Sequence, residues 1–237
     1  MRETSRIAGI LFDKDGTLID FNSTWFAVIS TLAQGAAPDA AAARQLVGQG
    51  GYDWGARKFI GGSVVAAGTI ADLVDLWHPE LAGPERAARI AAYDQTTVAE
   101  GSARAVGLPG LQPTLEQLVA RGFTLGIATN DSEAGARATA AALGLTGLFH
   151  SIIGYDSVAR PKPWPDQLAL FASRTGIAAS AIAMVGDNSH DLHMAHAAGA
   201  GLAIGVLSGN STRAELAPHA DVIVDSIADL PGLFAGR

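Results

Sequence analysis

Two aspartates at positions i and i+2 are the residues best placed to do chemistry. Asp13 and Asp15 directly follow a short apolar run, so both carboxylates leave the end of a buried strand on one side. One carboxylate can attack while the other handles protons. Gly16 allows a sharp turn, and exposed backbone N–H groups there can hold an anion. Because an isolated Asp-x-Asp pair is often only a capped turn, its meaning depends on residues further along the chain.

Further polar groups follow other apolar runs of the same kind. Thr129 and Asn130 end the second run, Asp187 and Asp191 follow the fourth, and Lys162 lies in the loop after the third. Ligands of open α/β sheets bind outside the carboxyl ends of the strands, so we expect these side chains to converge. Crowded carboxylates need a cation, and hard oxygen ligands suit Mg²⁺. The sequence therefore predicts a magnesium site at this edge of the sheet.

Six short apolar runs predict the strands that carry these groups. They cover residues 7–12, 123–128, 151–153, 182–185, 202–206 and 221–224. Between them, apolar residues recur at helical spacing over 111–121, 132–143, 164–175 and 189–198. Alternation of strands and helices is typical of a parallel sheet covered on both faces. We therefore predict a Rossmann-like α/β core.

A long segment after the first strand differs from the rest of the chain. Residues 21–105 are rich in Ala at helical spacing and contain no strand-like run. Trp25 and Trp54 within it are candidates either for contact with a ligand or for packing inside the insert. We predict an α/β core domain from residues 1–20 and 106–237, interrupted by a helical domain over 21–105.

The order of the polar motifs resembles that of the haloacid dehalogenase superfamily. The matching residues are Asp13-Lys14-Asp15-Gly16-Thr17, Thr129-Asn130, Lys162 and Gly186-Asp187-Asn188-Ser189-His190-Asp191. The resemblance covers nearly the whole chain, and it is closest to the phosphoglycolate phosphatase-like branch. The helical insert resembles the α-helical cap of that branch.

This resemblance implies a role for each motif residue. Asp13 would be the nucleophile that attacks phosphorus and forms an aspartyl-phosphate. Asp15 would protonate the leaving alkoxide and then serve as the base for the hydrolytic water. Thr129 and Asn130 would bind phosphoryl oxygens, and Lys162 would offset the charge on the nucleophile and the phosphoryl group.

The same resemblance implies a magnesium cofactor and narrows the reaction. Mg²⁺ would be held by the Asp13 carboxylate, the Asp15 backbone carbonyl and the Asp187 carboxylate, and Asp191 would act through a water molecule or contact the residues that hold the metal. Dehalogenase relatives lack a carboxylate at the position of Asp15 and lack the metal, and ATPase relatives carry Thr there. A carboxylate at this position therefore favours a phosphatase or a phosphomutase.

A small phosphorylated metabolite is the expected partner, and phosphoglycolate is the preferred candidate. Its carboxylate would need a cation such as Arg57 or Lys58, which we expect in a loop of the cap. The chain has only three lysines, Lys14, Lys58 and Lys162, so surviving lysines could mark sites that need a compact ammonium group. For Lys14 we prefer the simpler interpretation that it faces outward.

Composition excludes several other classes of protein. The chain of 237 residues has 16 Lys and Arg against 23 Asp and Glu, a net charge of −7, which argues against a nucleic-acid partner. It contains no Cys, so disulfides, thiolate metal sites and a cysteine nucleophile are excluded. No targeting or membrane-spanning segment is visible, so we expect a cytoplasmic protein with no membrane partner. We also expect a monomer or a homodimer.

Three alternatives stay open. A β-phosphoglucomutase-like enzyme of the same superfamily would return the phosphoryl group to a second hydroxyl instead of passing it to water. A regulatory phospho-acceptor domain also combines aspartates, Mg²⁺, Thr and Lys on a parallel sheet, but it accepts on a later strand and lacks a large insert. A non-catalytic metabolite-binding protein is disfavoured by the intact Asp13, Asp15, Lys162 and Asp187.

Overall fold

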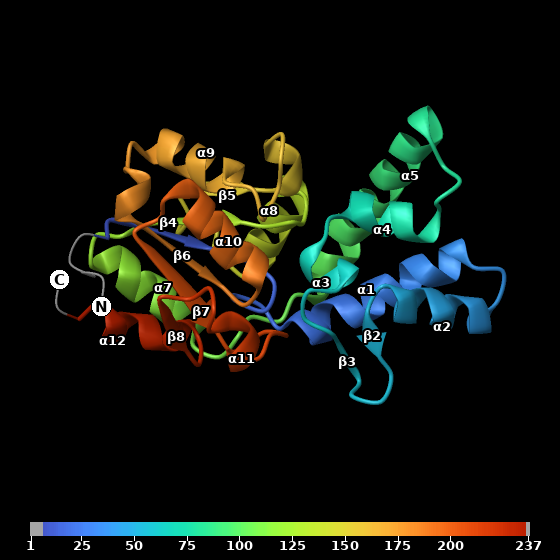
Figure 1. Cartoon of the computed structure of the whole chain (residues 1–237), viewed down its shortest axis with the longest axis horizontal. Helices are drawn as coiled ribbons and strands as arrows, with labels where there is room; N and C mark the ends of the chain where they lie inside the picture. Colours follow the sequence, from blue (N-terminus) through green and yellow to red (C-terminus); the bar gives the residue numbers. More distant parts are fainter. Residues whose placement is uncertain (1–6, 236–237) are drawn as a thin grey trace.

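A six-stranded parallel sheet forms the centre of the molecule. The computed structural model describes residues 7–235, and its strands lie in the order β5-β4-β1-β6-β7-β8 (Figure 1). Their bounds are Gly9–Phe12 (β1), Thr124–Ala128 (β4), Ser151–Ile153 (β5), Ile182–Gly186 (β6), Leu202–Val206 (β7) and Val222–Val224 (β8). The predicted α/β class is confirmed. Residues 1–6 and 236–237, which the prediction also assigns to the core domain, lie outside the described part.

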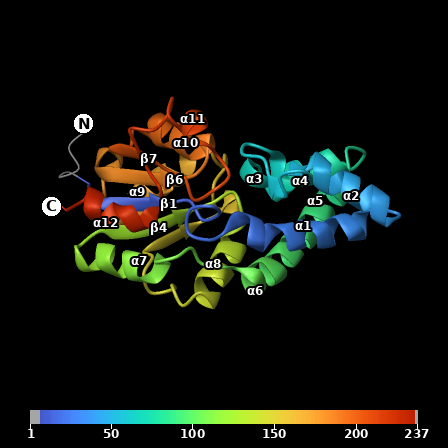
Figure 2. The same ribbon diagram turned by 90° about the horizontal axis from the view of Figure 1, so that it is seen from below.

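Helices cover both faces of the sheet, as the alternating pattern predicts (Figures 1 and 2). One layer contains α7 (Leu111–Ala120), α8 (Glu133–Ala142) and α12 (Leu230–Leu233), and the other contains α9 (Asp166–Thr175), α10 (Ser189–Ala198) and α11 (Arg213–Leu216). Short 3₁₀ turns lie at Tyr155–Ser157 (η3), Ala179–Ala181 (η4) and Ile227–Asp229 (η5). Along β1, Ile10 and Phe12 pack into the first layer and Leu11 into the second, because side chains of a strand alternate between faces.

The insert between β1 and α7 is largely helical and has its own apolar cluster. Its elements are α1 (Phe21–Ala36), α2 (Ala40–Gln49), β2 (Tyr52–Asp53), β3 (Lys58–Phe59), α3 (Val64–Ala67), α4 (Ile70–Trp77), α5 (Gly83–Thr96), a π-helical turn η2 (Thr97–Gly101) and α6 (Ser102–Arg104). Figure 1 shows this part extending to one side of the sheet. Among residues 7–235, no helix combines the length and the apolar character needed to cross a membrane.

The expectation that the insert contains no strands is wrong. β2 and β3 pair as an antiparallel hairpin. The Asp53 side chain accepts hydrogen bonds from the N–H groups of Gly55 and Ala56, and Arg57 closes the turn with a φ of 57°. Strands of two residues are too short to leave a periodic signal, which explains why the sequence pattern missed them.

Two neighbouring chain segments join the insert to the sheet. The N–H of Asp20 donates to the carbonyl of Val106 at 2.8 Å, and the N–H of Leu108 donates to that of Leu18 at 3.0 Å. Asp20 also caps α1, because its carboxylate accepts the N–H of Ser23 at 2.7 Å. The division of the chain at residues 21 and 105 stays a prediction.

Candidate active site

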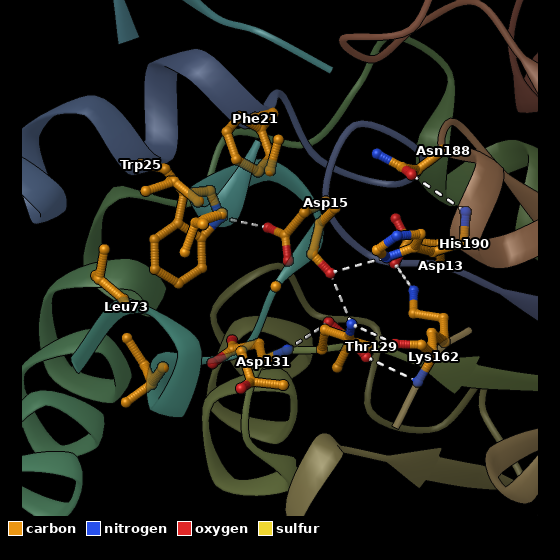
Figure 3. A pocket seen from close by; sticks show the side chains of 18 of the residues that line it. Asp13, Asp15, Phe21, Trp25, Leu73, Thr129, Asp131, Lys162, Asn188 and His190 are labelled. Carbon is orange, nitrogen blue, oxygen red and sulfur yellow. Dashed lines mark hydrogen bonds and ion pairs between the residues drawn. The ribbon is translucent and has the colours of Figure 1, made fainter. Parts of the chain in front are cut away.

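The three central strands bring the predicted site residues to one edge of the sheet. β4, β1 and β6 are neighbours, so the residues that follow them lie close together at their carboxyl ends. They line a pocket of about 70 Å³, roofed by the insert (Figure 3). A single water needs roughly 10–15 Å³ by this measure, so the pocket is a binding space and not a packing defect.

Three buried aspartates form the centre of this pocket. One carboxylate oxygen each of Asp13, Asp187 and Asp191 lies within 4.8 Å of the others. The ammonium group of Lys162 donates to Asp13 Oδ1 at 2.6 Å and to Asp191 Oδ1 at 2.7 Å. Lys162 reaches them from the loop that follows β5, and β5 is the strand next to β4. The structure therefore brings these four predicted residues into direct contact or close range.

A backbone N–H group binds the Asp187 carboxylate, and two glycines pack closely against it. The N–H of Asn210 donates to Asp187 Oδ2 at 2.9 Å. A Cβ atom at Gly16 or at Gly209 would collide with this carboxylate, and Gly16 has a φ of 83° that favours glycine. The glycine after Asp15 thus serves both the turn and the close approach of the loop after β1 to Asp187 and to Gly209 in the loop after β7.

Burial makes this cluster a strong candidate for a cation site. Burial raises the pKa of Asp13 to about 7 despite the neighbouring Lys162, and burial together with Asp13 and Asp191 raises that of Asp187 well above its usual range. One ammonium group cannot offset three carboxylates, so a divalent cation would favour their ionised forms. The oxygen-only donor set of Asp13, Asp187 and Asp191 fits Mg²⁺.

Asp15 belongs to a second buried cluster beside the first. Its Oδ1 accepts the indole N–H of Trp25 at 2.5 Å, and the Lys14 ammonium lies 2.8 Å from its Oδ2. Lys14 also pairs with Asp131 at 3.1 Å. The preferred interpretation of Lys14 as an outward-facing residue is therefore wrong, since it is only 2% exposed. Asp131 follows the Thr129-Asn130 motif directly, and its position beside a motif was the signal that could have found it.

Replacing Lys14 by Met should cost about 3–5 kcal/mol of unfolding free energy. The change removes the buried cation and leaves Asp131 without its partner. Burial already raises the pKa of Asp131, even though Lys14 acts to lower it. Urea denaturation measures this loss, and Lys58→Met, which removes an exposed lysine, is the matched control. Adding Asp131→Asn to Lys14→Met should recover about half of the loss or more. A loss below about 1 kcal/mol for Lys14→Met would contradict the ion pair.

Thr129 and Asn130 both line the pocket but differ in what they offer to a ligand. Thr129 Oγ1 accepts the N–H of Asp131 at 3.0 Å, which leaves its hydroxyl proton to donate. The Asn130 amide donates to the carbonyls of Ala67 and Lys162, and its oxygen accepts the Lys162 N–H. Asn130 therefore orients Lys162 and the insert, and its side-chain donors are already used. Binding of phosphoryl oxygens at Asn130 stays a prediction, for which its backbone N–H remains the candidate donor.

Contacts from the core fix the insert over the pocket. Ala67 at the end of α3 accepts the Asn130 amide at 2.7 Å, and His190 Nδ1 lies 3.3 Å from the same carbonyl. On the other side, the Asn22 amide donates to Asn210 Oδ1 at 2.8 Å. The N–H of Asn210 also donates to Asp187. Asn210 therefore contacts both the insert, through Asn22, and the acidic cluster.

The predicted cations of the insert do not reach this pocket. Arg57 and Lys58 are exposed on the hairpin and are absent from the pocket lining. Trp54 is not among the lining residues either, and its ring stacks against Arg44, whose Cζ lies 3.5 Å from the ring centroid. Trp25 does line the pocket, through α1.

Asn188 is a lining residue that the motif contains but that carried no predicted role. Its Oδ1 accepts the N–H of His190 at 3.1 Å and so caps α10. Its Nδ2 is buried without a hydrogen-bond partner among residues 7–235. An unpaired buried donor at a ligand pocket is suited to an oxygen atom of a ligand.

Comparison with known proteins identifies the family. The family model for haloacid dehalogenase-like hydrolases matches residues 7–199. A Dickeya dadantii protein named "Probable phosphatase IndB" is 43% identical over 125 residues, which are 52% of this chain and 54% of that protein. A phosphoglycolate phosphatase of Yersinia pestis is 31% identical over 235 residues, which cover 94% of this chain and 91% of the relative.

Solved structures agree on the fold. A haloacid dehalogenase-like hydrolase from Bacteroides fragilis superposes with a TM-score of 0.76 at 21% identity, and the match covers 94% of this chain and 99% of the other. At this identity the likeness concerns the fold alone, whereas the family match rests on sequence. The chain therefore belongs to the haloacid dehalogenase-like hydrolases and is a phosphatase of the phosphoglycolate phosphatase-like kind.

Proposed function

We propose that the protein is a Mg²⁺-dependent phosphatase that hydrolyses a small phosphomonoester through an aspartyl-phosphate on Asp13. One observation supports this proposal above all others. Asp13 lies in a buried carboxylate cluster with Lys162 at 2.6 Å, and Asp15 stands two residues further along the chain in the same pocket. A nucleophile, a proton donor and a charge-stabilising group are the parts that phosphoryl transfer needs.

The first half of the reaction forms the covalent intermediate. A carboxylate oxygen of Asp13 attacks phosphorus, and the bond from phosphorus to the ester oxygen breaks. Asp15 gives its proton to the departing oxygen, so the product leaves as a neutral alcohol. The indole N–H of Trp25 holds the Asp15 carboxyl group in place for this transfer.

The second half returns the enzyme to its starting state. Asp15, now ionised, takes a proton from a water molecule that attacks the phosphorus of the acyl phosphate. The bond between phosphorus and the Asp13 oxygen breaks, which releases inorganic phosphate and restores both carboxyl groups. Lys162 stays paired with Asp13 and Asp191 on one side of the reacting atoms, and the Thr129 hydroxyl can donate to a phosphoryl oxygen.

The proposed cofactor would be held mainly by Asp13 and Asp187, with the backbone carbonyl of Asp15 and with Asp191 nearby. When bound, Mg²⁺ supplies positive charge that lets a phosphate dianion approach a carboxylate. Lys162 alone cannot do this, because it already faces two carboxylates.

The substrate class is a small phosphomonoester. Relatives named phosphoglycolate phosphatase make phosphoglycolate a candidate, and it belongs in any assay panel. Its carboxylate would need a cation near the leaving group, and the pocket lining contains neither Arg57 nor Lys58. The partner, the cytoplasmic location and the monomeric or dimeric state stay predictions.

Removal of the metal tests this proposal. We expect Mg²⁺-dependent phosphate release from p-nitrophenyl phosphate and from a few small esters, a fall of at least about a hundredfold with EDTA, and recovery when Mg²⁺ is returned. Binding has its own readout: Mg²⁺ should raise the melting temperature of the parent protein and have little effect on Asp187→Asn. Release that is unchanged by EDTA would refute the metal requirement. Transfer to a second hydroxyl of a hexose 1-phosphate, without free phosphate, would support the phosphomutase alternative instead.

A further inference from the structure

We propose that the ester hydrolysed here has an uncharged, apolar leaving group, and that the pocket discriminates against a carboxylate on that group. This inference rests on the proposed phosphatase function and specifies its substrate class. The observation that supports it is the wall of the pocket that the insert supplies. This wall faces the acidic cluster across the space where the ester would lie (Figure 3).

Apolar side chains make up most of this wall. Phe21, Trp25, Ile29, Val64, Ile70 and Leu73 all line the pocket. Figure 3 shows Phe21, Trp25 and Leu73 on the side of Asp15 that is opposite His190 and Lys162. Because Asp15 would protonate the leaving group, the atoms beyond the ester oxygen would extend toward these side chains.

The polar side chains of the wall, Trp25 and Thr69, already have partners in the chain. The Trp25 N–H donates to Asp15 at 2.5 Å. The Thr69 hydroxyl donates to Asp72 Oδ2 at 2.8 Å and accepts the N–H of Asp72. Asp72 therefore places an acidic group at the start of α4, where a free helix terminus could otherwise have attracted an anion. Hydroxyl or carboxylate groups of a substrate would gain little here.

The charges of the pocket point to the same conclusion. Lys162 is the only Lys or Arg in the pocket lining of the described chain, and it binds Asp13 and Asp191. Lys14 lies just behind, but its ammonium is committed to Asp15 and Asp131. A carboxylate on the leaving group would meet these acidic residues with no free Lys or Arg among the described lining residues to pair with, and an unpaired buried charge is costly.

The wall is fixed in its position over the reacting atoms. Ala67, at the end of α3, accepts the Asn130 amide at 2.7 Å, so the helix that carries Val64 is tied to the same strand end as Thr129. Trp25 ties α1 to Asp15 in the same way. The apolar surface is thus part of the assembled site.

Two esters of the same size test the inference with the parent protein. Isobutyl phosphate and 2-phosphoglycolate have leaving groups with the same number and branching of non-hydrogen atoms, but only the second carries a carboxylate. With saturating Mg²⁺, we expect kcat/KM to be about a hundredfold higher for isobutyl phosphate. Equal values, or a preference for phosphoglycolate, would overturn the inference.

A charge added to the wall should reverse part of this preference. Val64 is half-buried and lines the pocket, so Val64→Lys places an ammonium group beside the leaving group. Val64→Met has nearly the same length without the charge, and it is the matched control. We expect Val64→Lys to shift the ratio of the two kcat/KM values toward phosphoglycolate at least tenfold more than Val64→Met does. Equal ratios for the two variants would count against the inference.

Failure of the inference is distinguishable from failure of the proposed function. A parent protein that releases phosphate from p-nitrophenyl phosphate but prefers phosphoglycolate overturns the apolar leaving group alone. A folded parent protein that releases phosphate from none of the three esters with Mg²⁺ overturns both.

Discussion

Asp13→Asn is expected to lower kcat/KM for phosphate release by at least about a thousandfold, because it removes the attacking oxygen while keeping the shape of the side chain. The fold should survive the change. Burial raises the pKa of Asp13, which means that the surroundings already disfavour its charge, and Lys162 keeps its second partner Asp191. Phosphate release and urea denaturation on the same preparation measure the two effects.

Asp225→Asn is the matched control for this variant. Its side chain is 87% exposed on the core, and the same chemical change there should leave kcat/KM within about twofold. A folded Asp13→Asn protein with activity close to that of the parent would remove Asp13 from its assigned role. Loss of folding in that variant would be detected by the denaturation curve.

Lys162→Met should produce the second largest loss, again about a thousandfold in kcat/KM. Its ammonium lies between Asp13 and Asp191, and without it two buried carboxylates face each other and the phosphate. A charge pair near contact is worth about 4 kcal/mol in a surface-like dielectric, which is close to a thousandfold in rate. Stability without metal should also fall by about 3–5 kcal/mol, since a buried partner is removed.

Two further variants define what Lys162 supplies. Lys58→Met removes an exposed lysine by the same change and should keep its activity. Lys162→Arg should not restore the parent rate, because both bonds of the ammonium are short and the side chain is only 5% exposed, which leaves little room for a planar guanidinium. Parent-like activity of Lys162→Met would show that charge compensation comes from elsewhere.

The sequence predicted the parts of the site that depend on local pattern and on the rule of strand ends. Short apolar runs gave the six strands, and neighbouring parallel strands necessarily deliver Asp13, Thr129 and Asp187 to one edge. Lys162 was found through its place in the motif order. The sequence indicated that charged groups converge at this edge, but not that Lys162 pairs with Asp13 and Asp191.

Contacts between segments that lie far apart in the sequence could not be predicted from the sequence pattern. Lys14 was misjudged because nothing local shows that Asp131, more than a hundred residues away, is placed to pair with it. The bonds of the Asn130 amide to Ala67 and Lys162 could not be predicted, because they depend on where the insert and the loop after β5 lie. Arg57 and Lys58 were expected at the substrate because a carboxylate would need a cation. The hairpin that carries them outside the pocket could not be predicted, since its strands have only two residues.

The stereochemical course at phosphorus tests the central claim most directly. A p-nitrophenyl phosphorothioate made chiral with oxygen isotopes would be hydrolysed in water that carries a third isotope, and the configuration of the released thiophosphate would be determined. Attack by Asp13 followed by attack of water gives two in-line displacements, so overall retention is expected. Inversion would mean that water attacks the ester directly, and it would contradict an aspartyl-phosphate on Asp13.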